Sequence, residues 1–149
     1  MNEIDEQDLQ VFIDGALHYF TQISDESAEV RIPYLIKDDL IMDEFTGMIE
    51  ITGMRSGKIY FSAPRAMLRH ILHSLGENAN NEELYSDLVG EIANIISGNA
   101  RRKLGSDFNI SVPQVVRQEI IQMLDKKVHQ FAIPIRWKFY TSSLVIRLH

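Results

Sequence analysis

The chain has 149 residues, 45% of them hydrophobic, which is enough to bury a core within a single domain spanning residues 1–149. Its formal net charge is −6, and its basic residues are scattered apart from the run 101–103, which argues against the continuous basic face that nucleic acid requires. The lack of cysteine excludes disulfides, thiol catalysis and thiolate metal sites, and it is consistent with a reducing cytosol.

The start of the chain is acidic and lacks a basic region followed by an apolar run, so we expect no signal peptide. No apolar run approaches the ~20 residues that a membrane-spanning helix needs. These features predict a soluble, cytoplasmic protein that binds neither nucleic acid nor a membrane.

The first predicted element is an amphipathic helix over about residues 5–23, in which apolar side chains recur at helical spacing. Acidic residues occupy its first turns, where the helix dipole favours them. After a polar break, the segment 30–36 contains Pro33 and is typical of an edge or irregular strand, because proline cannot donate to a strand ladder.

Two strands are predicted next, over 45–54 and 57–63, because polar and apolar side chains alternate and a hairpin turn is plausible between them. A short helix follows from Pro64, which suits a first helical position, to Leu75. Gly76 ends this helix.

The helix predicted over about 81–104 has the clearest boundaries in the chain. Asn80 and Glu83 resemble a capping box at its start. The basic run 101–103 complements the dipole in its last turn, and Gly105 follows.

The C-terminal third is rich in strand-forming residues. The segment 108–116 is predicted to be a strand or an extended segment, and 119–127 is ambiguous between helix and strand. The segments 131–140 and 144–148 predict a closing hairpin around a turn at 141–143. The chain as a whole predicts a layered α/β (α+β) fold, with an antiparallel or mixed sheet of about six strands and the two longer helices packed together on one face.

The long helix carries one polar stripe on an otherwise apolar surface. At 100° per residue, the members of the stripe fall within roughly one quarter of the circumference: Asp87, Glu91, Asn94, Gly98 and Arg101. Two interior glycines, Gly90 and Gly98, border or lie on the stripe, and each costs ~1 kcal/mol of helix stability relative to alanine. They indicate either close packing against a neighbouring helix or the close approach of another backbone to the stripe.

Other candidate sites have weaker signals. His70 and His73 can share a helix face, but no third ligand accompanies them, which favours surface histidines over a metal site. The acidic pairs at 38–39 and 43–44 lack the spacing and the glycine of a calcium loop, which favours solvated loop acids.

The pattern Asp87-x-x-x-Glu91-x-x-Asn94 resembles the signature helix of the CheC/CheX/FliY phosphatase family of bacterial chemotaxis. The order of elements is similar to CheX over most of the chain, and the specific motif covers about residues 86–116. Pro113 follows Asn94 sooner than the proline of the family pattern does. The first helix carries no second Glu-x-x-Asn, and one site per chain resembles CheX, which is a homodimer in the family.

The resemblance implies that the chain hydrolyses the aspartyl-phosphate of a CheY-like response-regulator receiver domain. It implies that Asn94 positions the attacking water and that Glu91 docks on a lysine in the receiver's active site. Asp87 would contact the receiver peripherally, and Gly90 and Gly98 would clear space for it. The receiver supplies the phosphorylated aspartate and Mg²⁺, so the family's mechanism needs no metal or cofactor of the phosphatase's own. Such phosphoryl transfer depends on positioning and electrostatics.

Two alternatives stay open at this point. The first is a non-catalytic module of the same fold, which either binds a receiver domain or serves as a subunit of an assembly like the flagellar switch. The second, which is much weaker, is a metal-dependent enzyme that uses His70 and His73.

Overall fold

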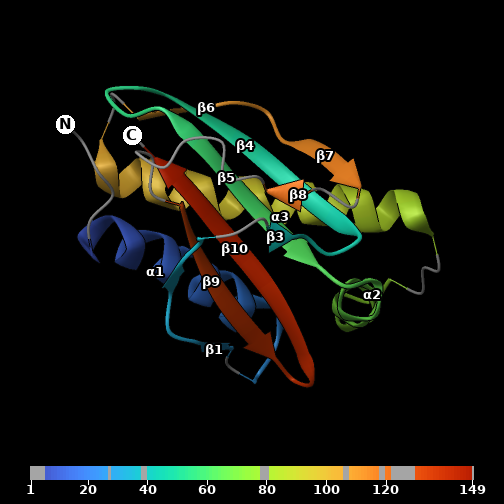
Figure 1. The fold of residues 1–149 in the computed structure, drawn as a ribbon. Coiled ribbons are helices and arrows are strands. Elements are labelled where there is room, and N and C mark those ends of the chain that lie inside the picture. Colours follow the sequence, from blue (N-terminus) through green and yellow to red (C-terminus); the bar gives the residue numbers. More distant parts are fainter. Residues whose placement is uncertain are drawn as a thin grey trace.

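The computed structural model describes residues 6–26, 28–37, 40–77, 81–105, 108–117, 120–121 and 130–148. These residues form an α+β fold in which helices pack on one face of an antiparallel sheet (Figure 1). The helices are α1 (Glu6–Ile23), α2 (Arg65–Ser74) and α3 (Glu82–Leu104). The strands are β1 (Glu29–Val30), β2 (Tyr34–Leu35), β3 (Leu40–Ile41), β4 (Phe45–Gly53), β5 (Gly57–Ala63), β6 (Phe108–Ile110), β7 (Gln114–Arg117), β8 (Ile120–Ile121), β9 (Gln130–Trp137) and β10 (Tyr140–Leu148).

The main sheet has the order β1-β9-β10-β5-β4-β6, with β2 also paired to β9 and β7 to β4, and it therefore contains eight strands. The sequence predicted about six strands. The structure has two more, because two of the predicted strands are each split by a proline that cannot donate to the ladder. Pro33 separates β1 from β2, and Pro113 separates β6 from β7. A separate two-stranded ribbon joins β3 to β8.

The predicted β4–β5 hairpin is confirmed, with Phe45 opposite Ala63 and Ile51 opposite Gly57. The predicted turn of the last hairpin is wrong. The chain reverses at 138–139, where Lys138 has a φ of 55°, and 141–143 lie inside β10. A serine is accommodated in the buried strand because the Ser142 hydroxyl donates to the carbonyl of Ile135 at 3.1 Å.

The predicted helices are confirmed, with small shifts at their starts. Asn81, and not Asn80, is the N-cap of α3, because its side-chain oxygen accepts from the backbone N–H of Glu83 at 2.8 Å. Pro64 is the N-cap of α2 and not its first helical residue. Asn80, the pair 38–39 and most of 119–127 lie outside the described residues, so their predicted roles have no structural counterpart here.

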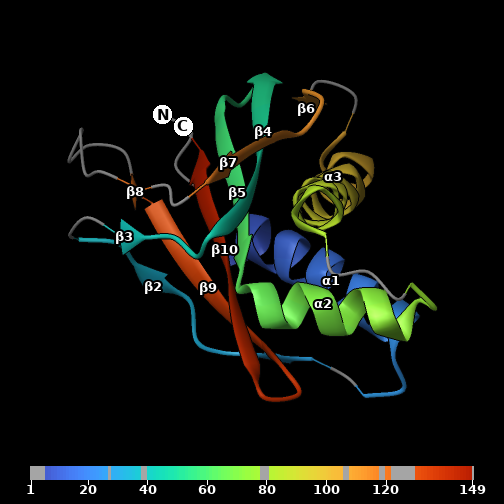
Figure 2. The same cartoon turned by 90° about the vertical axis from the view of Figure 1, so that its right-hand side faces the viewer.

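The long helices α1 and α3 pack together on one face of the sheet, as predicted, and Figure 2 shows β3 and β8 on the opposite side. The main core lies between the sheet and these helices, and its largest fully buried side chains include Trp137, Tyr85, Phe12 and Phe20. A smaller cluster covers the other face, formed by Ile36, Met42, Met48, Tyr60, Ala132 and Val145. Within the described ranges, no helix is both long enough and apolar enough to cross a membrane.

Gly47 of β4 sets how closely α3 approaches the sheet. A Cβ at this position would lie 2.4 Å from the carbonyl oxygen of Val89 and 2.8 Å from its carbonyl carbon. These are backbone atoms of α3, so they cannot rotate away as a side chain would. The sheet therefore holds α3 at a separation that only glycine permits at residue 47.

Candidate functional site

The polar stripe of α3 faces away from the core, as the helical spacing predicted. Asp87, Glu91 and Asn94 are exposed, and Gly98 is half-buried, while apolar residues on the opposite side of the helix are fully buried. Arg101 is also exposed, but its guanidinium donates to the carbonyl of Phe108 at 3.2 Å and ties the end of α3 to β6. The stripe available to a partner therefore runs from Asp87 to Gly98.

Two structural elements border this stripe. On one side Gly90 faces the β6–β7 connection, and a Cβ there would lie 3.4 Å from Pro113 Cβ. On the other side Asn99 of α3 meets Gly15 of α1, where a Cβ would lie 3.2 Å from the Asn99 side chain. At 100° per residue these contacts lie about half a turn apart, with the stripe between them. The stripe is thus a strip of helix exposed between the β6–β7 connection and α1.

The three polar side chains of the stripe are free to bind another molecule. Among the described residues, Asp87, Glu91 and Asn94 form no hydrogen bond or ion pair. Glu91 and Asn94 are three residues apart, so they lie on neighbouring turns of one helix face. Together they offer a carboxylate and an amide, which can accept and donate hydrogen bonds at adjacent points.

Tyr19 of α1 lies close enough to Glu91 to feel its charge, and sequence reasoning did not single out this tyrosine. Burial, and secondarily the negative charge of Glu91, raise the pKa of Tyr19 well above its ordinary value. The phenol therefore stays protonated to a higher pH than that of an exposed tyrosine. Its place beside α3 depends on the packing of two helices far apart in the chain, and no motif in the sequence signals it.

The two glycines of α3 have different surroundings. Gly90 is buried, and a Cβ there would make ordinary van der Waals contact with Pro113 and Val115. Gly98 faces open space: beyond its own helix turn, no heavy atom of the described residues lies within 4 Å of the point that an added Cβ would occupy. The close approach at Gly90 thus involves this chain's own β6–β7 connection, and Gly98 is the glycine that leaves the stripe open.

We expect Gly98→Ala to raise the free energy of unfolding by about 0.5–1 kcal/mol, because alanine is the better helix former and its methyl meets nothing. Chemical denaturation measures this change. Gly90→Ala is the matched control on the same helix, and its gain should be smaller because its methyl contacts Pro113. A loss of stability in Gly98→Ala would show that the open space at residue 98 is filled in solution.

One arginine, Arg65, fixes the start of α3. The Arg65 guanidinium donates to Glu44 Oε1 at 2.7 Å and to Glu82 Oε1, and it lies over the rings of Phe45 and Tyr85. It therefore joins α2, the residue before β4 and the first turn of α3. No sequence motif marked this arginine, because its partners are far from it along the chain.

The two histidines that were considered as metal ligands lie on α2. His70 Nδ1 is 3.1 Å from the Tyr140 hydroxyl, and the ring packs edge-on against Trp137, so His70 is a half-buried member of an aromatic cluster at the surface. His73 is exposed. Within the described part of the chain, no group of three or more His, Cys, Asp or Glu side chains is placed to hold a metal ion.

Comparison with known proteins adds independent support for a family. Residues 45–136, more than half of the chain, match the family model described as chemotaxis phosphatase CheX. No curated protein sequence shows significant similarity to the chain.

Solved structures with the same fold include a CheC-like superfamily protein from Shewanella sp. PV-4, at 23% identity and a TM-score of 0.83 over 98% of this chain and 99% of that one. The chemotaxis protein CheX from Vibrio vulnificus matches at 22% identity and a TM-score of 0.82, over 96% and 99%. CheX in the CheX–CheY–BeF₃–Mg²⁺ complex from Borrelia burgdorferi matches at 18% identity and a TM-score of 0.79, over 95% and 97%.

The family match includes all of α3, and therefore the whole polar stripe with its Glu91 and Asn94. It also includes Pro113, which packs beside Gly90 at the border of the stripe. The chain belongs to the CheX family of chemotaxis phosphatases.

Proposed function

We propose that this chain, as a single CheX-like domain in the cytoplasm, hydrolyses the aspartyl-phosphate of a CheY-like receiver domain. The observation that carries the proposal is a carboxylate and an amide on neighbouring turns of α3, both exposed and neither paired with any residue that the structure describes. The complex of a related CheX with CheY supports a receiver domain as the partner. The test is the decay of phosphorylated receivers, from a panel of CheY-like proteins, with and without the chain.

In the proposed mechanism Asn94 holds a water molecule in line with the phosphorus. Its amide carbonyl accepts a hydrogen bond from the water, and its N–H₂ group remains available to a phosphoryl oxygen. Holding the reactants in one geometry removes much of the entropic barrier of the reaction. The receiver contributes the acyl phosphate and holds Mg²⁺, so this chain needs no nucleophile or metal of its own.

Glu91 is assigned to docking. Its exposed carboxylate would pair with a lysine of the receiver's active site and fix the register of α3 on the receiver. It is not assigned as a general base. Asp87, one turn closer to the start of α3, would contact the receiver at the edge of the interface, and Gly98 would let the receiver approach the helix closely.

We expect Glu91→Gln to raise the apparent KM for the phosphorylated receiver by roughly tenfold and to change kcat much less, because a docking ion pair stabilises the bound state and the transition state alike. Steady-state phosphate release at varied receiver concentration measures both constants. Glu83→Gln, an exposed carboxylate in the first turn of the same helix, is the matched control and should leave both constants unchanged. A large fall in kcat at saturating receiver would assign Glu91 to the chemical step instead.

We also propose that the chain is a homodimer with one site in each subunit. Strands β6 and β1 lie at the two ends of the sheet order, and either edge can continue into a second copy. Sedimentation equilibrium should give twice the mass of the chain at micromolar concentration. A monomer mass that persists up to high concentration would contradict the dimer without touching the proposed chemistry.

The alternative is a non-catalytic module of the same fold that binds a receiver or serves in an assembly like the flagellar switch. The amide of Asn94 argues against it, because binding alone does not need a water-positioning group at that point. Capture of a receiver with no change in the lifetime of its phosphate would favour the module.

A further inference from the structure

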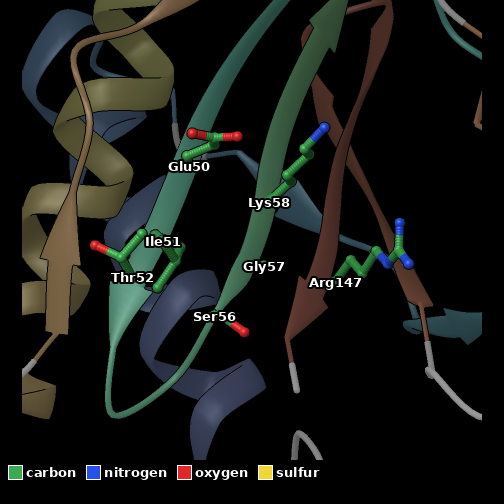
Figure 3. A pocket seen from close by; sticks show the side chains of 7 residues that line it. All are labelled: Glu50, Ile51, Thr52, Ser56, Gly57, Lys58 and Arg147. Carbon is green, nitrogen blue, oxygen red and sulfur yellow. The ribbon is translucent and has the colours of Figure 1, made fainter.

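A second polar site lies on the sheet face that α1 and α3 do not cover. Glu50 of β4, Lys58 of β5 and Arg147 of β10 stand side by side, with Glu50 opposite Lys58 and Lys58 opposite Arg147 in the strand register. Figure 3 shows the three side chains on one side of these strands, with α1 behind them. They line an open pocket of about 320 Å³ near the β4–β5 turn.

The alternation along each strand fixes this orientation. The neighbours Ile49, Ile51 and Ile59 point into the core beneath the helices, so Glu50 and Lys58 point to the opposite face. Val145, two residues before Arg147, belongs to the smaller cluster on that opposite face. The pocket and the α3 stripe are therefore on different sides of the sheet.

The charges in this pocket are not balanced by the described residues. Lys58 and Arg147 are like charges directly opposite each other, an arrangement that destabilises a strand pair. Neither is in an ion pair with a described residue, and the single carboxylate of the row, Glu50, is opposite Lys58 and separated from Arg147 by β5. Arg147 Nε is buried and has no hydrogen-bond partner within the described ranges. A buried donor without a partner is costly, so the site is one acceptor short.

The rest of the pocket is suited to a small polar molecule. Thr52 and Ser56, which carry hydroxyl groups, also line it. Gly57 forms its floor, at a φ of 154°, and a Cβ there would lie 1.8 Å from the carbonyl oxygen of Arg147. The backbones of the two cation-bearing strands therefore approach each other at Gly57 more closely than any side chain would permit.

We infer that this pocket binds a small oxyanion, a carboxylate or phosphate group, held by Lys58 and Arg147. Two cations on adjacent strands match an anion with two or more oxygens, and charge-assisted hydrogen bonds are the strong ones in proteins. Because the pocket is remote from the α3 stripe, its occupancy is independent of the proposed phosphatase chemistry.

The test is an NMR titration of the ¹⁵N-labelled chain with inorganic phosphate in one arm and malonate in the other, at constant ionic strength set with chloride. Both should produce saturable shifts at the amides of Thr52–Lys58 and Arg147, and the tighter of the two identifies the anionic group. Lys58→Gln should weaken binding by roughly tenfold or more. Glu50→Gln should tighten it, because the carboxylate repels the anion and competes for Lys58.

Arg69→Gln, which removes one exposed positive charge from α2, is the matched control and should bind as the unaltered chain does. Shifts that stay linear with concentration, or a Kd that is the same in Lys58→Gln and the unaltered chain, would overturn the proposal. So would weaker binding in Glu50→Gln. The titration contains no receiver domain, so its failure and a failure of the phosphatase proposal are distinguishable.

Discussion

Asn94→Ala should slow the chain's acceleration of receiver dephosphorylation by about 10²-fold or more, the scale expected when one positioning group is removed. Asn94 is exposed and makes no hydrogen bond with a described residue, so its removal costs the fold nothing. Alanine is also the better helix former at this position. The effect should appear in kcat, with little change in KM, because the amide acts on the water and Glu91 is assigned to docking.

The measurement is the rate of phosphate release from a phosphorylated receiver with equal amounts of each variant. Asn109→Ala is the matched control, because Asn109 is another exposed asparagine, on β6. It should retain the full rate. Equal acceleration by Asn94→Ala and the unaltered chain would remove Asn94 from the mechanism, even if the chain is a phosphatase.

Gly47→Ala should lower the free energy of unfolding by roughly 3 kcal/mol, at the upper end of the cost of overpacking a core. The added methyl would lie 2.4 Å from the carbonyl oxygen of Val89, so either β4 or the whole of α3 must move. Because α3 carries Glu91 and Asn94, the surviving folded protein should also be a poorer phosphatase. Urea denaturation measures the first effect and phosphate release the second.

Gly90→Ala is the matched control, since Gly90 follows Val89 directly and tests the side of the same turn that faces the β6–β7 connection. There a methyl meets Pro113 Cβ at 3.4 Å, an ordinary contact, and we expect a small gain in stability. If Gly47→Ala unfolds at the same denaturant concentration as the unaltered chain, the close approach of α3 to β4 is not a constraint in solution.

The stripe of α3 could be predicted because it depends on local spacing alone. Helical periodicity places Asp87, Glu91 and Asn94 on one face of the helix, independently of the rest of the chain. The remaining, apolar faces of the helix must be buried. The family motif then assigned roles to the same residues. The structure adds the borders of the stripe, at Pro113 on one side and α1 on the other.

Features that depend on contacts distant in sequence could not be predicted. The periodicity of α3 drew attention to Gly90 and Gly98, whereas the glycine with the closest backbone contact to α3 is Gly47, in a strand. The cluster of Arg65 with Glu44 and Glu82 and the row of Lys58 with Arg147 form only when separate elements meet.

Errors at the ends of elements came from single residues. The turn of the last hairpin was misplaced because Phe139 is a strand former by composition, yet it sits in the turn and is 84% exposed. Ser142 and Ser143 favour a turn by composition, yet they lie in β10. Two prolines each divided one predicted strand in two, which changed the strand count and left the order of the elements intact.

The most direct test of the central claim counts turnovers. A phosphorylated CheY-like receiver, with Mg²⁺ and in large excess over the chain, should release many phosphates per chain at a rate well above its own autodephosphorylation. Catalysis by the α3 stripe predicts this result, and it predicts that Asn94→Ala loses it. Phosphate release at the receiver's intrinsic rate, with every receiver of the panel and with binding demonstrated, would contradict the phosphatase and leave a receiver-binding module.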